Sequence, residues 1–554
     1  MSSVPAAIGQ IAVLAILLIL TVPFVGKYLA HIYTSEKHWR IERWTYKLMR
    51  VDGDADQHWR AYAMSVLGFS LVGILFLYAF ARLQHLFPLS LGFSGFPAAG
   101  AFNTAISFVT NTNWQWYSGE SAAGHLFQMA GLAVQNFLSA AVGLAVAAAF
   151  ARALARSRAG GRIGNFWSDV IRTTYRVLIP MSFIGALILI GFGAIQNFHG
   201  VHDLTTLTGG TQHLTGGPVA SQEAIKQIGT NGGGFYNANS AHPFENPTPF
   251  TNLLQIYWEI LLPFSIAWAF GLIVKDKRQG GAIVATMAAL FSMGVALTTW
   301  AEMAHPGLAP MLAGGALEGK EVRFGEAGSA LFSAATTATS TGAVNSMHDS
   351  FTAAGGGVQL FNMMLGEISP GGVGSGLYGM LMLAVVTVFL CGLMVGRTPE
   401  YLGKKIGQRE IILPALYILA TPLLILIGDA VAITAKDGVA GMLNSGTHGF
   451  SEVLYAVTSA GNNNGSAFGG LTSGTTFWDT LLGLIMLFGR FLPMIFVLAL
   501  AGRFASTKTL PPSAGTLPTH KPLFVGLLAS VAIVVVGLTY VPALVLGPIA
   551  EALS

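Results

Sequence analysis

Long apolar runs alternate with polar segments along the whole chain. A helix that crosses the hydrocarbon core of a membrane needs about 20 mostly apolar residues. The segments that meet this condition are 8–30, 61–81, 127–150, 176–195, 252–274, 281–300, 376–396, 411–434, 479–500 and 522–546. The pattern predicts an all-α polytopic membrane protein with ten transmembrane helices. Because the first run has no basic residue before it, we expect an uncleaved span rather than a removed signal peptide.

The composition agrees with a membrane protein and excludes several other classes. The 554 residues are 53% hydrophobic and 10% charged, whereas a typical soluble domain carries about 25% charged residues. A net charge of +4 gives no support to a nucleic-acid-binding role. The single cysteine, Cys391, cannot form an intrachain disulfide.

Basic residues are distributed unevenly between the two sets of loops that alternate along the chain. One set, with the adjoining span ends, holds 23 of the 29 Lys and Arg residues. The other set carries only Arg82, Lys226, Lys320, Arg323 and Lys436, and Arg490 lies within a span. Since loops rich in Lys and Arg face the cytoplasm, we expect both termini and the poor loops to lie outside it.

Four of the predicted outward loops share one design. Each contains a stretch of small residues compatible with a short helix, followed by an uncharged turn rich in glycine, asparagine, threonine and serine. From the first to the fourth, these turns are Thr110–Asn113, Thr230–Gly233, Ser340–Ala343 and Asn463–Ser466. Their spacings of 120, 110 and 123 residues indicate internal repetition.

The repetition predicts four units, each built as a span, a pore loop and a second span. The units are 61–150, 176–274, 281–396 and 411–500, and single spans at 1–30 and 522–546 flank them. The third unit has a broken second span. We therefore expect a pseudo-fourfold arrangement around one axis.

The chemistry of these four turns suits them to bind a cation. Irregular backbone at membrane depth persists only where it is buried in protein or lines a wet cavity. Glycine lets carbonyl oxygens point inward, and a ring of carbonyl oxygens can replace the hydration shell of potassium. Each short helix also directs the negative end of its dipole toward the centre. Any one loop alone is better explained as an ordinary turn, but fourfold recurrence favours a cation filter.

Several long motifs resemble those of one transporter family. They are VTNTNWQWYSGE, GTNGGGFYNANSAHPFENPTPF, TSTGAVNSMHDS, GGVGSGLYGM, VGRTPEYLGKKI and NNNGSAF. Over nearly the whole chain the sequence is similar to KdpA, the potassium-binding component of the Kdp potassium-transporting P-type ATPase, within the potassium transporter superfamily. The resemblance implies a protein of the bacterial inner membrane that selects extracytoplasmic potassium and passes it through a tunnel for ATP-driven, high-affinity uptake.

The resemblance also implies the partners of a Kdp complex: the catalytic P-type ATPase chain KdpB, the chain KdpC and the very small chain KdpF, besides membrane lipid. The present chain has neither a Walker A motif nor a DKTG phosphorylation motif. We therefore expect it to be non-catalytic and to bind no nucleotide, with potassium as its only ion.

The family's filter residues fall on the four turns. They are Asn111, Thr112, Asn113, Thr230, Asn231, Gly232, Ser340, Thr341, Gly342, Asn463, Asn464 and Gly465. Gln115 matches a position that affects selectivity in the family. No turn has the TVGYG sequence of potassium channels, so we expect fewer well-formed ion sites than in a channel.

A break interrupts span seven between Gly366 and Gly376, where proline and glycines cannot continue an unstrained helix. One interpretation is a surface turn between two packed helices. The other is an intramembrane loop beneath the third turn that gates ion passage, and the resemblance favours it. The candidate gating residues in this region are Glu367, Gly371, Gly372 and Ser375.

Arg490 lies in the middle of span nine, where an arginine costs at least about 2.5–3.5 kcal/mol on insertion scales. It either forms an ion pair that holds helices together, with Glu367 as a candidate partner, or acts as a fixed cation below the filter. In the second role it would discourage leak and steer potassium sideways. Glu302, near a span end, is expected to be solvated.

The histidines near the turns, His242, His348 and His448, have no metal-ligand spacing and are predicted to be ordinary loop residues. Two alternative functions remain: a gradient-driven transporter component of the Trk or Ktr type, and a membrane scaffold whose loops bind a protein. An ATP requirement for uptake separates the first from the pump component, and ion binding would exclude the scaffold.

Overall fold

The computed structural model describes residues 4–304, 312, 314–394, 396–511 and 516–553. Within these residues, ten helices are long and apolar enough to cross a membrane, which confirms the predicted number. They are α1 (Val4–Thr34), α3 (Trp59–Leu83), α6 (Val134–Ala155), α7 (Phe166–Thr173) continued by α8 (Ile179–Gly191), α10 (Pro249–Ile273), α11 (Lys277–Ala304), α15 (Ser375–Met394), α16 (Gln408–Thr434), α19 (Thr476–Ser506) and α20 (Pro522–Leu544).

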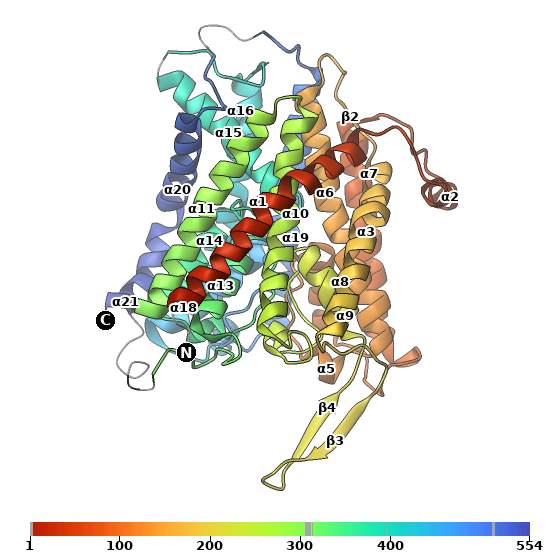
Figure 1. Cartoon of the computed structure of the whole chain (residues 1–554), viewed down its shortest axis with the longest axis vertical. Helices are drawn as coiled ribbons and strands as arrows, with labels where there is room; N and C mark the ends of the chain where they lie inside the picture. Colours follow the sequence, from red (N-terminus) through yellow and green to blue (C-terminus); the bar gives the residue numbers. More distant parts are fainter. Residues whose placement is uncertain (1–3, 305–311, 313, 395, 512–515, 554) are drawn as a thin grey trace.

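The spans form a bundle whose centre and periphery differ in burial. The most apolar windows of Phe127–Ala155 and Pro249–Ile273 are 83% buried, whereas that of α1 is only 11% buried. The central helix α6 is rich in alanine, and small side chains let helix backbones approach closely. Both termini lie at the lower end of the bundle in Figure 1.

Short helices descend inside the bundle before each of the four turns. They are α4 (Ala98–Val109), α9 (Val219–Ile228), α13 (Gly325–Ala338) and α18 (Gly446–Asn462). The longest has 17 residues, and at 1.5 Å per residue each is too short to cross a membrane. They coincide with the small-residue stretches of the sequence and end at the turns, which they hold within the protein.

Side-chain caps explain where several helices begin. The Thr248 hydroxyl accepts a hydrogen bond from the Thr251 amide at 3.2 Å, with Pro249 in the first helical position of α10. The Thr475 hydroxyl accepts one from the Trp478 amide at 3.3 Å, at the start of α19.

One predicted boundary is wrong. The fourth span begins at Phe166 rather than at residue 176, so Arg172 and Arg176 lie inside a helix and not in a loop. The Arg176 guanidinium binds the buried Glu42 carboxylate through Nε–Oε1 and Nη2–Oε2 contacts of 2.5 and 2.6 Å. Because this partner neutralises the arginine, the helix can continue through it. Span seven ends at Met394, and residue 395 lies outside the described residues.

The remaining helical elements are α2 (Arg40–Met49), α5 (Gly119–Ala122), α14 (Ala353–Met364), α17 (Lys436–Val439), α21 (Ala550–Leu553), η1 (Gln84–Leu86), η2 (Phe127–Ala133), η3 (Thr174–Leu178), η4 (Asn239–Ala241), η5 (His348–Ser350) and η6 (Val545–Ile549). Antiparallel pairs join β1 (Gln57–His58) to β2 (Arg162–Gly164), β3 (Val201–Thr205) to β4 (Thr211–Thr215), and β5 (Glu400–Tyr401) to β6 (Lys404–Lys405). Of all these elements, η2, η3 and η6 lie within or overlap predicted spans, and the others were not predicted as separate elements. The β3–β4 hairpin projects from the end of the bundle where the termini lie, and α2 lies at the opposite end (Figure 1).

Candidate functional site

The four turns meet at one place inside the bundle. A Cβ atom added to Gly232 would lie 2.5 Å from the Thr112 carbonyl oxygen, 2.9 Å from the Thr341 carbonyl oxygen and 3.0 Å from Gly465 Cα. These atoms belong to the first, third and fourth turns. A Cβ on Gly465 would overlap the Thr112 carbonyl oxygen. Glycine is therefore required where the backbones of different turns touch.

Asparagine side chains join neighbouring turns. Asn111 Nδ2 donates to the Thr230 carbonyl oxygen at 2.6 Å and links the first turn to the second. Asn463 Nδ2 donates to Thr112 Oγ1 at 2.9 Å and links the fourth to the first. Asn464 Nδ2 donates to the Thr339 carbonyl oxygen at 2.9 Å, next to the third turn. The amide hydrogens thus fix the turns to one another.

The backbone of the turns adopts an uncommon conformation. Four non-glycine residues of the turns have positive φ angles: Asn111 at 69°, Asn113 at 60°, Thr230 at 47° and Asn463 at 59°. Such angles are uncommon, above all for a β-branched residue such as threonine. The surrounding hydrogen bonds hold this conformation, and the strain is located at the place where the four turns meet.

The central helix α6 also contacts the first turn, a contact that was not predicted from the sequence. Asn136 Oδ1 accepts a hydrogen bond from Asn113 Nδ2 at 2.6 Å, and Ser139 Oγ donates to Asn111 Oδ1 at 2.7 Å. Polar residues three apart in an alanine-rich span were the available signal, because such residues lie on one helix face.

Gln115 lies against the second turn. Its Oε1 accepts a hydrogen bond from the Gly234 amide at 2.8 Å, and a Cβ on Gly233 would lie 2.7 Å from the same oxygen. Outside the turns, a cavity of about 810 Å³ is lined by Gln115, Gly233, Gly342 and Gly465, among other residues of the four loops. The meeting point therefore opens to a vestibule on the side where the termini lie.

The break in span seven is buried and contacts two of the turns. It occupies residues 365–374, between α14 and α15, and residues 367–374 are all buried. The Gly371 amide donates to the Ala338 carbonyl oxygen, and the Val373 amide donates to Thr230 Oγ1, each at 3.0 Å. Ser340 Oγ and Ser375 Oγ lie 3.4 Å apart. The surface-turn interpretation of this break is wrong.

Glu367 and Arg490 line one small cavity of about 90 Å³ beneath the third and fourth turns, together with Ser340 and Asn463. Glu367 Oε1 accepts a hydrogen bond from Asn464 Nδ2 at 2.7 Å. Among the described residues, no ion pair within 4.0 Å joins Glu367 to Arg490. Arg490 Nη2 lies close to Gly143 of α6, 3.3 Å from the position of an added Cβ.

Comparison with known proteins shows the family of this chain. Residues 11–553 match the family described as Potassium-transporting ATPase A subunit. The chain belongs to this family. Two relatives named potassium-transporting ATPase potassium-binding subunit, from Kineococcus radiotolerans and Streptomyces coelicolor, are each 58% identical to it. The alignment with the first covers all of this chain and 99% of the relative, and the alignment with the second covers both chains completely. Family membership makes the chain one component of a potassium-transporting ATPase.

A solved structure supports the fold. The potassium transporter TrkH from Vibrio parahaemolyticus aligns with 87% of this chain and 98% of its own chain, with a TM-score of 0.53 and 15% identity. At this identity the likeness concerns the fold alone. It confirms the predicted fold class, because the chain shares its architecture with this potassium transporter.

The expectation for Glu302 is wrong, because this residue is fully buried. Its Oε2 lies 3.0 Å from Lys320 Nζ, and its Oε1 accepts a hydrogen bond from the Thr352 amide at 2.9 Å. Lys320 Nζ also lies 4.6 Å from the centre of the Phe351 ring. Lys320, which follows α11 in the sequence, therefore neutralises Glu302 near the end of that helix. Hydropathy at the span end does not reveal this partner.

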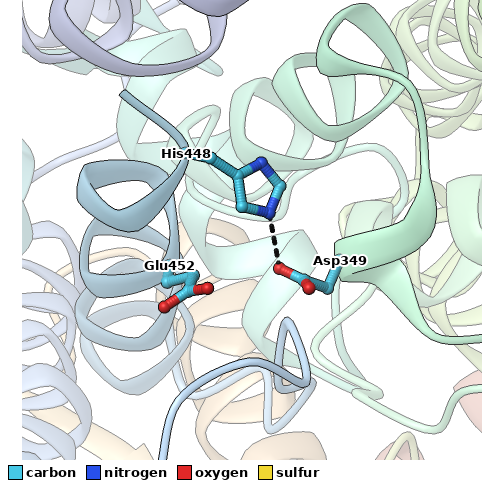
Figure 2. A group of neighbouring side chains, drawn as sticks. All are labelled: Asp349, His448 and Glu452. Atoms are coloured by element: carbon cyan, nitrogen blue, oxygen red, sulfur yellow. Dashed lines mark hydrogen bonds and ion pairs between the residues drawn. The ribbon is translucent and has the colours of Figure 1, made fainter. Parts of the chain in front are cut away.

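His448 lies near the start of α18, in a cluster with acidic side chains. The ligand atoms of Asp349, His448 and Glu452 lie within 4.8 Å of one another (Figure 2). His448 Nε2 lies 2.9 Å from Asp349 Oδ1, and its Nδ1 lies 2.8 Å from Glu551 Oε1. Glu452 instead accepts hydrogen bonds from the Leu443 and Asn444 amides at 3.0 and 3.2 Å. These contacts favour a charged imidazolium between two carboxylates over a metal site.

The three histidines near the turns differ in charge, which the sequence does not predict. The hydrogen bond to Asp349 and then that to Glu551 raise the pKa of His448 to about 9. Burial lowers the pKa of His348 to about 3 and that of His242 to about 4. His448 is therefore cationic at neutral pH, whereas the other two are neutral.

The thermal stability of the purified protein is expected to fall as the pH rises through about 9. The folded state raises the pKa of His448 above its unfolded value, so the stabilisation is complete below about pH 6.5 and disappears above about pH 9. Unfolding temperatures between pH 6 and 10 measure this. His448→Gln should flatten the profile, whereas His202→Gln, on the exposed hairpin, should not; identical profiles for all three proteins would contradict the charged cluster.

Proposed function

We propose that this chain selects and binds extracytoplasmic potassium at the four turns and passes it to a partner ATPase chain for ATP-driven, high-affinity uptake. The observation that carries the proposal is the contact of Gly232 with backbone atoms of the other three turns. This contact brings backbone from four distant segments to one point, with the carbonyl oxygens of Thr112 and Thr341 among the atoms that meet there. A ring of such oxygens is a ligand set for a dehydrated potassium ion.

Charge supports this assignment. None of the four turns contains a charged residue, so selection relies on oxygen dipoles and on the negative ends of α4, α9, α13 and α18. The vestibule of about 810 Å³ supplies hydrated ions to the ring. Gln115, which accepts a hydrogen bond from the Gly234 amide just after the second turn, tunes the selectivity of the ring.

The structure on the inner side of the ring supports transfer of the ion to a partner chain rather than straight passage through the membrane. The loop 365–374 is buried from residue 367 onward and contacts Thr230 of the second turn and Ser340 of the third. In this proposal it blocks a straight path for the ion. Gly371 and Gly372, together with Ser375 at the start of α15, allow the loop to move as a gate in this proposal, and Glu367 attracts the ion that leaves the ring. Arg490 repels a cation from the direct path and steers it sideways, into a cavity that extends to Tyr540 of α20.

The proposed complex contains the catalytic chain KdpB, KdpC and the small KdpF, in the bacterial inner membrane, with both termini of the present chain outside the cytoplasm. This chain binds no nucleotide, so ATP hydrolysis belongs to KdpB.

The decisive experiment measures potassium-stimulated ATPase activity of the purified complex and uptake of rubidium tracer into proteoliposomes. We expect ATP hydrolysis to require potassium, with sodium unable to replace it, and uptake to require ATP. Uptake driven by an ion gradient without ATP would instead favour a transporter of the Trk or Ktr type. Failure of the complex to bind or move any ion would overturn the proposal and favour a scaffold.

A further inference from the structure

A buried cluster of charged and polar side chains lies behind the second turn. It consists of Glu223, Lys226, Asn239, Ser240 and Glu245, and we call it the Lys226 cluster. The Lys226 side chain is only 1% exposed. Its Nζ lies 2.5 Å from Glu223 Oε2 and 2.9 Å from Glu245 Oε2. It also donates to Asn239 Oδ1 at 2.8 Å and to Ser240 Oγ at 3.1 Å.

The cluster joins the helix before the second turn to the segment after it. Glu223 and Lys226 belong to α9, which ends at the turn, whereas Asn239, Ser240 and Glu245 follow the turn. A buried ammonium is stable only when its charge and its hydrogens are satisfied, and here both arms of the loop satisfy it. Lys226 therefore links the two ends of the loop that carries the second turn.

Two members of the cluster also hydrogen-bond to the backbone of the turn and of the residues just after it. Asn239 Nδ2 donates a hydrogen bond to the Gly233 carbonyl oxygen. Glu245 Oε1 accepts one from the Tyr236 amide at 2.7 Å. Gly233 follows directly on Gly232, which touches the other three turns. The direction of the Gly233 carbonyl thus depends, through Asn239, on the ammonium of Lys226.

We propose that Lys226 is a positioning residue of the second turn, which fixes Asn239 and through it the Gly233 carbonyl, and so sets potassium affinity and discrimination against sodium. This inference rests on the function proposed above. A freely rotating ammonium presents three donors and satisfies two carboxylates and an amide oxygen together. The planar guanidinium of an arginine has a different donor geometry. The Lys226→Arg variant should therefore not reproduce the native hydrogen bonds of the cluster.

The test compares the potassium dependence of ATPase activity in complexes that carry Lys226→Met or Asn239→Ala. Asn239→Ala removes the link to Gly233 and leaves both ion pairs of Lys226 in place, so it remains informative if Lys226→Met fails to assemble. We expect the potassium concentration for half-maximal activity to rise about tenfold or more. Sodium should begin to stimulate hydrolysis, while the maximal rate stays near native.

The control is Glu42→Gln, which removes one charge of the buried pair with Arg176 at the opposite end of the bundle. It should lower thermal stability without changing ion dependence. Native potassium affinity and sodium rejection in Asn239→Ala would overturn the positioning role. A native complex whose ATPase activity does not respond to potassium would overturn the proposed function itself, and this inference with it.

Discussion

Replacing Gly232 by alanine is expected to weaken the apparent potassium affinity of the complex by about 10- to 100-fold. The added Cβ would lie 2.5 Å from the Thr112 carbonyl oxygen and 2.9 Å from that of Thr341. Both are backbone atoms that cannot rotate away, so the turns must separate. Inserting a methyl group into a packed site costs about 1–3 kcal/mol, and about 1.4 kcal/mol corresponds to a tenfold change in affinity.

The matched control is Gly68→Ala. Gly68 lies in α3, and no atom lies within 4 Å of an added Cβ. The same chemical change should therefore leave both assembly and potassium dependence intact. The measurement is ATPase activity of the purified complexes across potassium concentrations. If Gly232→Ala keeps the native half-maximal concentration, the ion does not bind where the four turns meet.

Replacing Arg490 by glutamine is expected to open a passive leak through the assembled complex. Arg490 lines the cavity beneath the third and fourth turns. At an effective dielectric constant of about 20, a fixed charge about 8 Å from a passing cation raises its energy by about 2 kcal/mol. Removing this barrier should increase ATP-independent rubidium efflux from proteoliposomes about tenfold or more. Transport per ATP hydrolysed should fall in parallel.

Arg490→Lys keeps the positive charge and serves as the control. It should retain low passive efflux, because the barrier depends on charge more than on the shape of the guanidinium. If glutamine and lysine variants both leak no more than the native complex, and only their thermal stability decreases, then Arg490 holds helices together and does not guard the path.

Most of the fold could be predicted from the sequence, because its main determinants are local. A span is specified by the length of an apolar run relative to the membrane, and this rule predicts the number of spans correctly. The four turns were also visible, since glycine and asparagine after a small-residue helix form a local pattern. The start of the fourth span was wrong because the charge of Arg176 is neutralised by Glu42, 134 residues earlier.

The order of amino acids alone specifies the helices, their number and the uncharged character of the turns. The packing of the chain in three dimensions determines which side chains and backbone groups contact one another. Asn463 reaches Thr112 across 351 residues, His448 lies between Asp349 and Glu551, and Lys320 neutralises Glu302. Such contacts depend on how helices pack around a common axis, and no local pattern records that geometry. Hydropathy therefore predicts where the chain crosses the membrane, whereas packing determines the carbonyls and charges that an ion would meet.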